Sequence, residues 1–276
     1  MKTKLPALLL TLTLSLTACG AAPAATGSQS APDLSGARAL PQTMEETPPV
    51  DLPTLRLTLV DGAGTDTLLL AGETAGEVYT VPTDSFPLTL DGEPADASVL
   101  EDGMPLTVAY TGIEETFPAR LSIAAAEAYR LGTEKNPGGG FYDLCGLYLQ
   151  VLSDLAEGGE ETVAVDLSQA PGDLTEGEKA AIAWRFRETC GAGLADPENA
   201  APGTARFTIR AASWEEGEAY SLPVLQFEAE RSQTLPAGPD GTRPATARIL
   251  QDCFAVWPEF GTWTGYQVGS EVLACG

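Results

Sequence analysis

Hydrophobic residues alternate with polar ones in several short runs between residues 52 and 131. A period of two places the hydrophobic side chains on one face of an extended chain, so each run predicts a half-buried β-strand. Asp-Gly and Thr-Gly pairs, which favour tight turns, separate the runs. Five or six short strands in this stretch predict a small antiparallel β-barrel that is OB-like. The alternating positions are Leu55, Leu57 and Leu59; Phe86, Leu88 and Leu90; Leu106, Val108 and Tyr110; and Phe117, Ala119, Leu121 and Ile123.

The pattern changes after Asn136-Pro137 and the three glycines at 138–140, which mark a boundary. From residue 140 to residue 276 the expected order is helix, strand, helix and then several strands. This order predicts an α+β domain in which two helices cover a mainly antiparallel sheet. The expected strands are Val163–Leu167, Arg206–Ala211, Leu222–Glu230, Ala247–Trp257 and Thr262–Val268.

Both predicted helices carry signals at their ends. Hydrophobic residues recur at helical spacing over 144–155, and Gly158-Gly159 end that run. The second helix begins at Thr175. Glu178 follows three residues later, so the two side chains can satisfy the free N–H groups at the helix start as a capping box. Gly191 is a suitable C-terminal stop.

The first eighteen residues read as a signal peptide. Two lysines precede the apolar segment Leu5–Leu16, which is too short to cross a bilayer. Thr17 and Ala18, both small, then precede Cys19. This ending resembles the lipobox of bacterial lipoproteins, and the resemblance implies cleavage before Cys19 and attachment of a diacylglyceryl group to its sulfur. An ordinary secretory peptide is the alternative.

Residues 19–51 would then form a lipidated tether. The stretch is rich in Ala, Pro, Ser, Gly and Thr and has few large apolar groups. Such a composition cannot bury enough surface to offset the entropy of ordering, so we expect a disordered segment. Two acyl chains hold a protein firmly on a membrane. The sequence therefore predicts a protein anchored to the outer face of the cytoplasmic membrane.

Composition excludes several classes of function. The chain has 39 Asp and Glu against 15 Lys and Arg, a net charge of −24. A field of this sign repels nucleic acid and favours cationic partners. With no histidine, the chain cannot form Ser-His-Asp or Cys-His triads or imidazole metal sites. The sequence indicates no cofactor and no metal.

Four cysteines follow the lipobox, and their pairing is open. Outside the membrane, Cys145, Cys190, Cys253 and Cys275 could form two disulfides in three ways. The alternative is free thiols that pack as small hydrophobic side chains. Cys190 favours that alternative, because it shares a helical face with Ile182 and Phe186. Nothing in the sequence marks any of these thiols as reactive.

Two parts of the chain resemble known families. The stretch LEDGMPLTVAYTGIEETFPARLS resembles a small barrel domain of uncharacterised lipoproteins of Gram-positive bacteria, mainly over residues 99–122. The stretches DLCGLYLQVLSDL, VDLSQAPGDLTEGEKAAIAWRF and DCFAVWPEFGTWTGYQVGSEV resemble an uncharacterised C-terminal domain of lipoproteins from Gram-positive anaerobes. Neither resemblance implies a catalytic residue. The chain departs from the second pattern over 193–203, where GLADPENAAPG forms a short link.

The candidate ligand site is the aromatic segment WPEFGTWTGY. Trp257, Phe260, Trp263 and Tyr266 could stack on sugars or clasp a peptide, because exposed aromatic rings are frequent contact residues. The alternative is a hydrophobic plug at the sheet edge, since large aromatic side chains mostly serve the cores of small domains.

Asp252 is the second candidate in the site. On a regular strand it shares a face with Leu250, Phe254 and Val256, where a buried carboxylate would need a partner such as Arg248 or Arg210 or would have a raised pKa. With Glu259 it could form the acid/base pair of a glycosidase, a chemistry that works without histidine. The alternative is a structural carboxylate.

The sequence thus predicts a membrane-anchored extracytoplasmic lipoprotein that is not an enzyme. We expect a binding, adaptor or sensory module whose partners are the membrane, through the lipid, and another envelope protein or a glycan, but not nucleic acid. A histidine-free carboxylate hydrolase acting on extracellular glycan is the alternative function.

Overall fold

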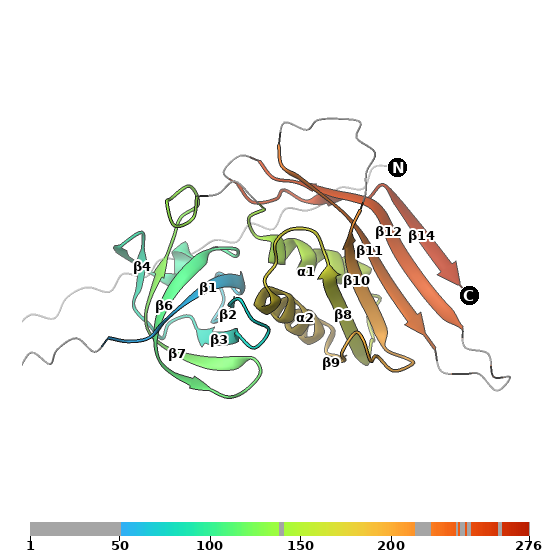
Figure 1. Cartoon of the computed structure of the whole chain (residues 1–276), viewed down its shortest axis with the longest axis horizontal. Helices are drawn as coiled ribbons and strands as arrows, with labels where there is room; N and C mark the ends of the chain where they lie inside the picture. Colours follow the sequence, from blue (N-terminus) through green and yellow to red (C-terminus); the bar gives the residue numbers. More distant parts are fainter. Residues whose placement is uncertain are drawn as a thin grey trace, which may run out of the picture. The chain divides into compact units, whose positions relative to one another are not determined.

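The computed structural model describes residues 51–137, 141–212, 222–235, 237, 241, 244–258 and 261–275. The predicted leader, Cys19 and the tether lie outside the described residues, and so do Glu259 and Phe260. The described residues belong to one compact unit of the chain. They form a β-barrel, two helices and a second sheet, which confirms the predicted α+β class (Figure 1).

Five strands close the barrel. They are β1 (Thr54–Asp61), β2 (Thr67–Ala71), β3 (Val78–Pro82), β6 (Pro105–Glu114) and β7 (Ala119–Ala128). Around the ring the order is β1-β2-β3-β7-β6, and every pair is antiparallel except β3–β7, which is parallel at Tyr79↔Ala119 and Thr80↔Arg120. A small hairpin, β4 (Leu88–Leu90) and β5 (Glu93–Ala95), extends the sheet from β7, and a 3₁₀ turn follows at Ala97–Val99. This is the small OB-like barrel that the sequence predicts.

Strands β2 and β3 were not predicted, because their residues are buried on both sides. Leu68 and Leu70 point into the barrel interior, whereas Leu69 and Ala71 belong to the cluster around the helices. The consecutive apolar run over 68–71 therefore lacks the period of two that identifies a half-buried strand.

The two helices occur where their end signals predict them. Helix α1 spans Leu144–Leu155 and helix α2 spans Glu176–Cys190. The capping box of α2 is confirmed, since Glu178 N–H donates to the Thr175 hydroxyl and Thr175 N–H donates to the Glu178 carboxylate. Gly191 caps the C-terminus with φ 64°, a conformation that suits glycine.

The second sheet is mainly antiparallel, as predicted. Its strands are β8 (Thr162–Gln169), β9 (Gly193–Leu194), β10 (Ala205–Ala211), β11 (Val224–Thr234), β12 (Ala245–Val256), β13 (Tyr266–Gln267) and β14 (Ser270–Cys275). They lie in the order β13-β12-β11-β10-β8-β9, with β14 also paired to β12. Only the β8–β10 and β8–β9 pairs are parallel among these strands.

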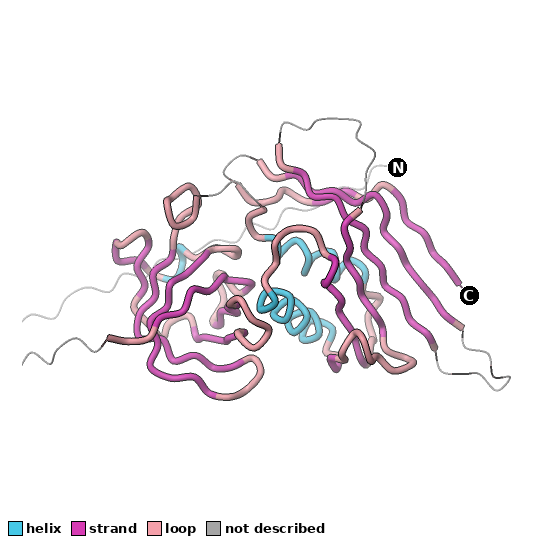
Figure 2. Tube along the Cα trace, in the orientation of Figure 1, coloured by secondary structure: helices cyan, strands magenta, loops and turns pink. Residues whose placement is uncertain are grey.

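The helices contact both sheets. One cluster of buried residues includes Leu69, Val78 and most apolar residues of α1 and α2, together with Phe207 and Phe227 of the second sheet. The helices thus form a layer between the outside of the barrel and one face of the second sheet (Figure 2). The Thr175 hydroxyl also donates to the Gly72 carbonyl at 2.7 Å, which ties the start of α2 to the barrel.

A β-bulge in β12 overturns the predicted face of Asp252. The register moves from Phe227↔Cys253 to Ala229↔Leu250, so two residues of β12 lie opposite one residue of β11. Asp252 takes φ 52° at this point. The extra residue brings Leu250 and Cys253 to the same buried face, followed by Ala255 and Trp257. Asp252 therefore does not share a face with Leu250, Phe254 and Val256 in the way that a regular strand requires.

All four cysteines of the described part of the chain are free thiols. Cys145 and Cys253 are buried, Cys190 is half-buried and Cys275 is exposed. Of the two alternatives left open by the sequence, the structure has free thiols, and Cys145 and Cys253 pack in the core while Cys275 does not.

Candidate binding site

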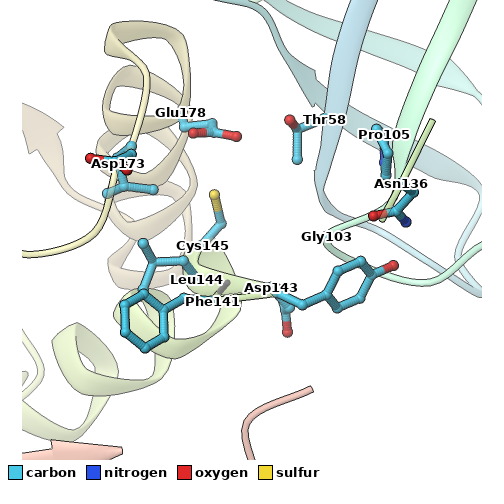
Figure 3. A pocket seen from close by; sticks show the side chains of 12 residues that line it. Thr58, Gly103, Pro105, Asn136, Phe141, Asp143, Leu144, Cys145, Asp173 and Glu178 are labelled. Atoms are coloured by element: carbon cyan, nitrogen blue, oxygen red, sulfur yellow. The ribbon is translucent and has the colours of Figure 1, made fainter. Parts of the chain in front are cut away.

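A cavity of about 390 Å³ lies between the barrel and the starts of the two helices (Figure 3). Thr58 and Pro105, a directly paired couple of β1 and β6, form its barrel side. Asp143, Asp173 and Glu178 lie on the helix side. The residues around it are Thr58, Gly103, Pro105, Asn136, Phe141, Tyr142, Asp143, Leu144, Cys145, Asp173, Leu174 and Glu178.

The turn at Gly103 brings the barrel close to the start of α1. Gly103 has φ 88°, and a Cβ added there would lie 2.7 Å from the backbone nitrogen of Asp143. Only glycine allows both this conformation and this approach. Asp143 itself has φ 56° and caps α1, accepting a hydrogen bond from Gly146 N–H at 3.1 Å. Aspartate tolerates this left-handed conformation better than most residues.

The surroundings of Asp143 disfavour the ionised form of its carboxyl group. Burial is the main cause that raises its pKa to about 6, and the negative charges of Asp102 and Asp61 act in the same direction, whereas the Gly146 and Trp263 N–H groups oppose the rise. Burial also raises the pKa of Asp102, which accepts a hydrogen bond from Ala63 N–H at 3.0 Å. No arginine or lysine side chain among the described residues pairs with Asp143.

The net field in the cavity is negative. Three acidic residues line it, Asp143, Asp173 and Glu178, and none of its described lining residues is lysine or arginine. The carboxylate of Asp143 points away from Glu178 and Thr58 (Figure 3) and accepts from the N–H groups of Gly146 and Trp263. The N-termini of α1 and α2 oppose these charges by only about +0.5 elementary charge each. The carboxylates of Asp173 and Glu178 therefore outweigh the two helix ends.

Cys145 and Tyr142 also line the cavity but are poorly suited to catalysis. Burial raises the pKa of the Cys145 thiol well above its ordinary value, so it stays protonated and is a poor nucleophile. Burial likewise raises the pKa of the Tyr142 hydroxyl, and nearby Glu101 adds to the effect. That hydroxyl is buried without a hydrogen-bond partner among the described residues. A ligand with a polar group could provide one.

The predicted aromatic segment packs against residues 141–143, on the side that faces away from the cavity. Trp257 is only 1% exposed, and its indole N–H donates to the Tyr142 carbonyl at 2.8 Å while its ring contacts Phe141 edge-on. Trp263 N–H donates to the Asp143 carboxylate at 3.3 Å. With almost none of its surface open, Trp257 cannot offer its ring to a ligand. The segment instead holds residues 141–143, which form one wall of the cavity.

The other predicted site residues are dispersed. Tyr266 packs on the core near Phe227, and its hydroxyl donates to Asp154 at 2.8 Å, next to the end of α1. Asp252 is exposed at the bulge. Neither lines the cavity. Phe260 and Glu259 lie outside the described residues, so the predicted Asp252–Glu259 pair has no measured separation.

The same part of the chain bears on metal binding and on membrane insertion. In the described ranges, no group of three or more His, Cys, Asp or Glu residues is arranged to hold a metal ion. None of the helices in those ranges is long and apolar enough to span a bilayer. Comparison with known proteins gave no match to a family model, a curated protein or a solved structure.

The cavity was not predicted from the sequence. Thr58, Gly103, Asp143 and Glu178 are far apart along the chain and meet only because α2 packs on the outside of the barrel. One signal was available. The Asp102-Gly103 pair predicts a tight turn between strands, but this local sequence does not show that the turn lies against the start of α1.

Proposed function

We propose that the protein is a lipid-anchored, non-catalytic binding module at the outer face of the cytoplasmic membrane, and that its cavity binds a small organic cation. The observation that carries the proposal is the lining: three acidic residues with no described lysine or arginine among them. The anchor rests on Cys19 and the leader that precedes it.

An organic ammonium group fits the lining better than a bare ion does. Phe141 and Tyr142 contribute aromatic side chains, and a cation near an aromatic face is attracted by the ring electrons. A volume of about 390 Å³ is at the small end of the range for ligand pockets. The carboxylates are not arranged as a metal cluster within the described residues, which favours a larger cation.

A binding role agrees with the chemistry of the cavity. Its thiol stays protonated, its tyrosine pKa is raised, and the chain has no histidine to act as a base. The alternative hydrolase would depend on Asp252, which is exposed at a bulge and does not line the cavity. No observation on Asp252 favours that chemistry.

The test is isothermal titration with choline and with 3,3-dimethylbutan-1-ol, its neutral isostere. The full chain carrying Cys19→Ser should bind choline and not the alcohol. Asp173→Asn should weaken choline binding about fivefold, the effect of losing one ion pair worth about 1 kcal/mol. Asp173 is exposed and outside the capping box, so the fold should survive the change.

Glu115→Gln, an exposed carboxylate on the barrel away from the cavity, is the matched control and should bind choline as the parent does. Binding should also strengthen as pH rises through about 6, because Asp143 then ionises. Equal affinity for choline and the neutral alcohol, or an Asp173→Asn variant indistinguishable from Glu115→Gln, would contradict the proposal.

A further inference from the structure

Strand β14 lies at the edge of the second sheet, and no described strand pairs with its outer side. Its six residues, Ser270–Cys275, pair only with β12 in the sheet order of the described strands. All six residues are exposed. Figure 1 shows β14 as the outermost long arrow of the sheet. Every second residue of such an edge presents a backbone N–H and C=O that can pair with another extended chain.

This edge lacks the usual protections against pairing. Proteins shorten their edge strands or place charges, prolines or bulges on them. The opposite edge follows this rule, since β9 has two residues. In β14, by contrast, Val272 is 40% exposed and Leu273 is 72% exposed. Its one charged residue, Glu271, is neutralised by Arg248 at 2.8 Å.

The surroundings of β14 are acidic. Leu273 is paired with Arg248, which lies on the same face of the sheet and donates to the Asp154 carbonyl at 2.8 Å. The negative charges of Glu271 and Glu157 both act on Arg248. Asp252 is an exposed carboxylate beside Gly269, directly before the strand, but the bulge takes it off the face that Leu250 and Arg248 share. Arg231 is paired directly with Arg248 and lies 3.2 Å from Glu157 and 3.3 Å from Glu160. Near this edge two arginines therefore face three carboxylates, those of Glu271, Glu157 and Glu160.

We propose that β14 is a docking edge for an extended, basic segment of another protein, which adds to the sheet as a further strand. The backbone of the segment would pair with the open side of β14, and its side chains would alternate between the two faces. On the face of Leu273, apolar and basic side chains are complementary to the leucine and to the carboxylates. A second copy of this chain is disfavoured as the occupant, since each copy has a net charge of −24.

The proposal does not depend on the cavity, and its test uses different probes. Three labelled peptides of about nine residues, a length that covers a typical strand, are titrated against the full chain carrying Cys19→Ser. The first alternates lysine with valine, the second alternates glutamate with valine, and the third is the lysine peptide N-methylated at every second residue. Fluorescence anisotropy measures binding, and hydrogen exchange measures protection of the β14 amides.

The lysine peptide should bind and protect β14, whereas the glutamate and N-methylated peptides should bind at least about tenfold more weakly. Leu273→Lys should weaken the lysine peptide by a similar factor. Ile113→Lys is the matched control, because Ile113 is an exposed apolar residue on a barrel strand, 42% open, and it should change nothing.

Each other outcome overturns the proposal. Equal binding of the N-methylated peptide would mean that no strand is added, and equal binding of the glutamate peptide would remove the argument from charge. Failure of all three peptides to bind would mean that the edge accepts no such segment. A chain that dimerises in sedimentation, loses the dimer on Leu273→Lys and ignores the peptides would assign β14 to a second copy.

Discussion

At the scale of single residues, the pKa values of two buried carboxylates, Glu160 and Asp143, shift in opposite directions. Glu160 is buried beside Arg231, with 3.3 Å between Oε1 and Nε, and it accepts a hydrogen bond from Glu157 N–H. Burial alone would raise the pKa of Glu160, but these N–H groups and the arginine outweigh it and lower the pKa. Burial also disfavours the charged form of Asp143, but no cation lies beside it, so its pKa is raised. Asp143 is therefore the carboxylate that a ligand could relieve.

The raised pKa of Asp143 predicts that Asp143→Asn stabilises the fold at neutral pH. Between its ordinary value of 3.8 and the folded value of about 6, the unfolded chain is ionised while the native chain holds a proton. The parent thus loses stability as pH rises from about 4 to about 6, on the order of 3 kcal/mol in total. Asparagine keeps the capping oxygen and tolerates the left-handed conformation.

Urea unfolding at pH 4 and pH 7.5 measures this effect. The advantage of the asparagine variant over the parent should be larger at the higher pH, whereas Glu115→Gln should show no such trend. A pH-independent difference for Asp143→Asn would mean that burial does not penalise the charged form.

At the scale of elements, Thr175 has two tasks at the start of α2. Its hydroxyl accepts from Glu178 N–H within the capping box and donates to Gly72 of the barrel. Thr175→Ala removes both interactions. We expect a loss of about 1–2 kcal/mol in the free energy of unfolding, the upper part of the range for a lost N-cap.

Thr189→Ala is the control on the same helix, since its hydroxyl only donates back to the Arg185 carbonyl near the exposed C-terminal end. Chemical denaturation of both variants checks the prediction. A cost for Thr175→Ala no greater than that for Thr189→Ala would show that neither the cap nor the contact with the barrel matters for stability.

The elements that the sequence predicted are those with local signals. The spacing over 144–155, the capping box at Thr175 and Gly191 identified both helices, and alternation identified β1, β6 and β7. Strands β2 and β3 were missed because packing on two sides removes alternation. The bulge at Asp252 could not be foreseen, since one extra residue in β12 is defined only by its partner strand β11.

At the scale of the whole molecule, the location depends on a part of the sequence outside the described residues. Cys19 and its leader predict a lipid anchor, and two acyl chains contribute about 0.8 kcal/mol for each buried methylene. The cavity, by contrast, lies in the described residues but was not predicted from the sequence. The sequence held no local pattern for it, because it forms where the barrel, α1 and α2 meet.

We expect Cys19→Ser to abolish labelling by palmitate and to move the protein from the membrane fraction to the soluble fraction. The cause is the loss of the only sulfur to which the lipobox directs a lipid. Cys275→Ser, which replaces an exposed thiol, should retain both the label and the membrane location. Unaltered fractionation of the Cys19→Ser protein would mean that a lipid on Cys19 does not hold the protein at the membrane.

The free state of Cys275 has a practical consequence. Among the described thiols it is the exposed one, whereas Cys145 and Cys253 are shielded within the core and Cys190 is partly covered. A maleimide dye or spin label should therefore attach selectively at the end of β14 in a chain whose Cys19 is serine. Such a reporter needs no engineered cysteine, and it would sense directly whatever approaches that margin of the sheet.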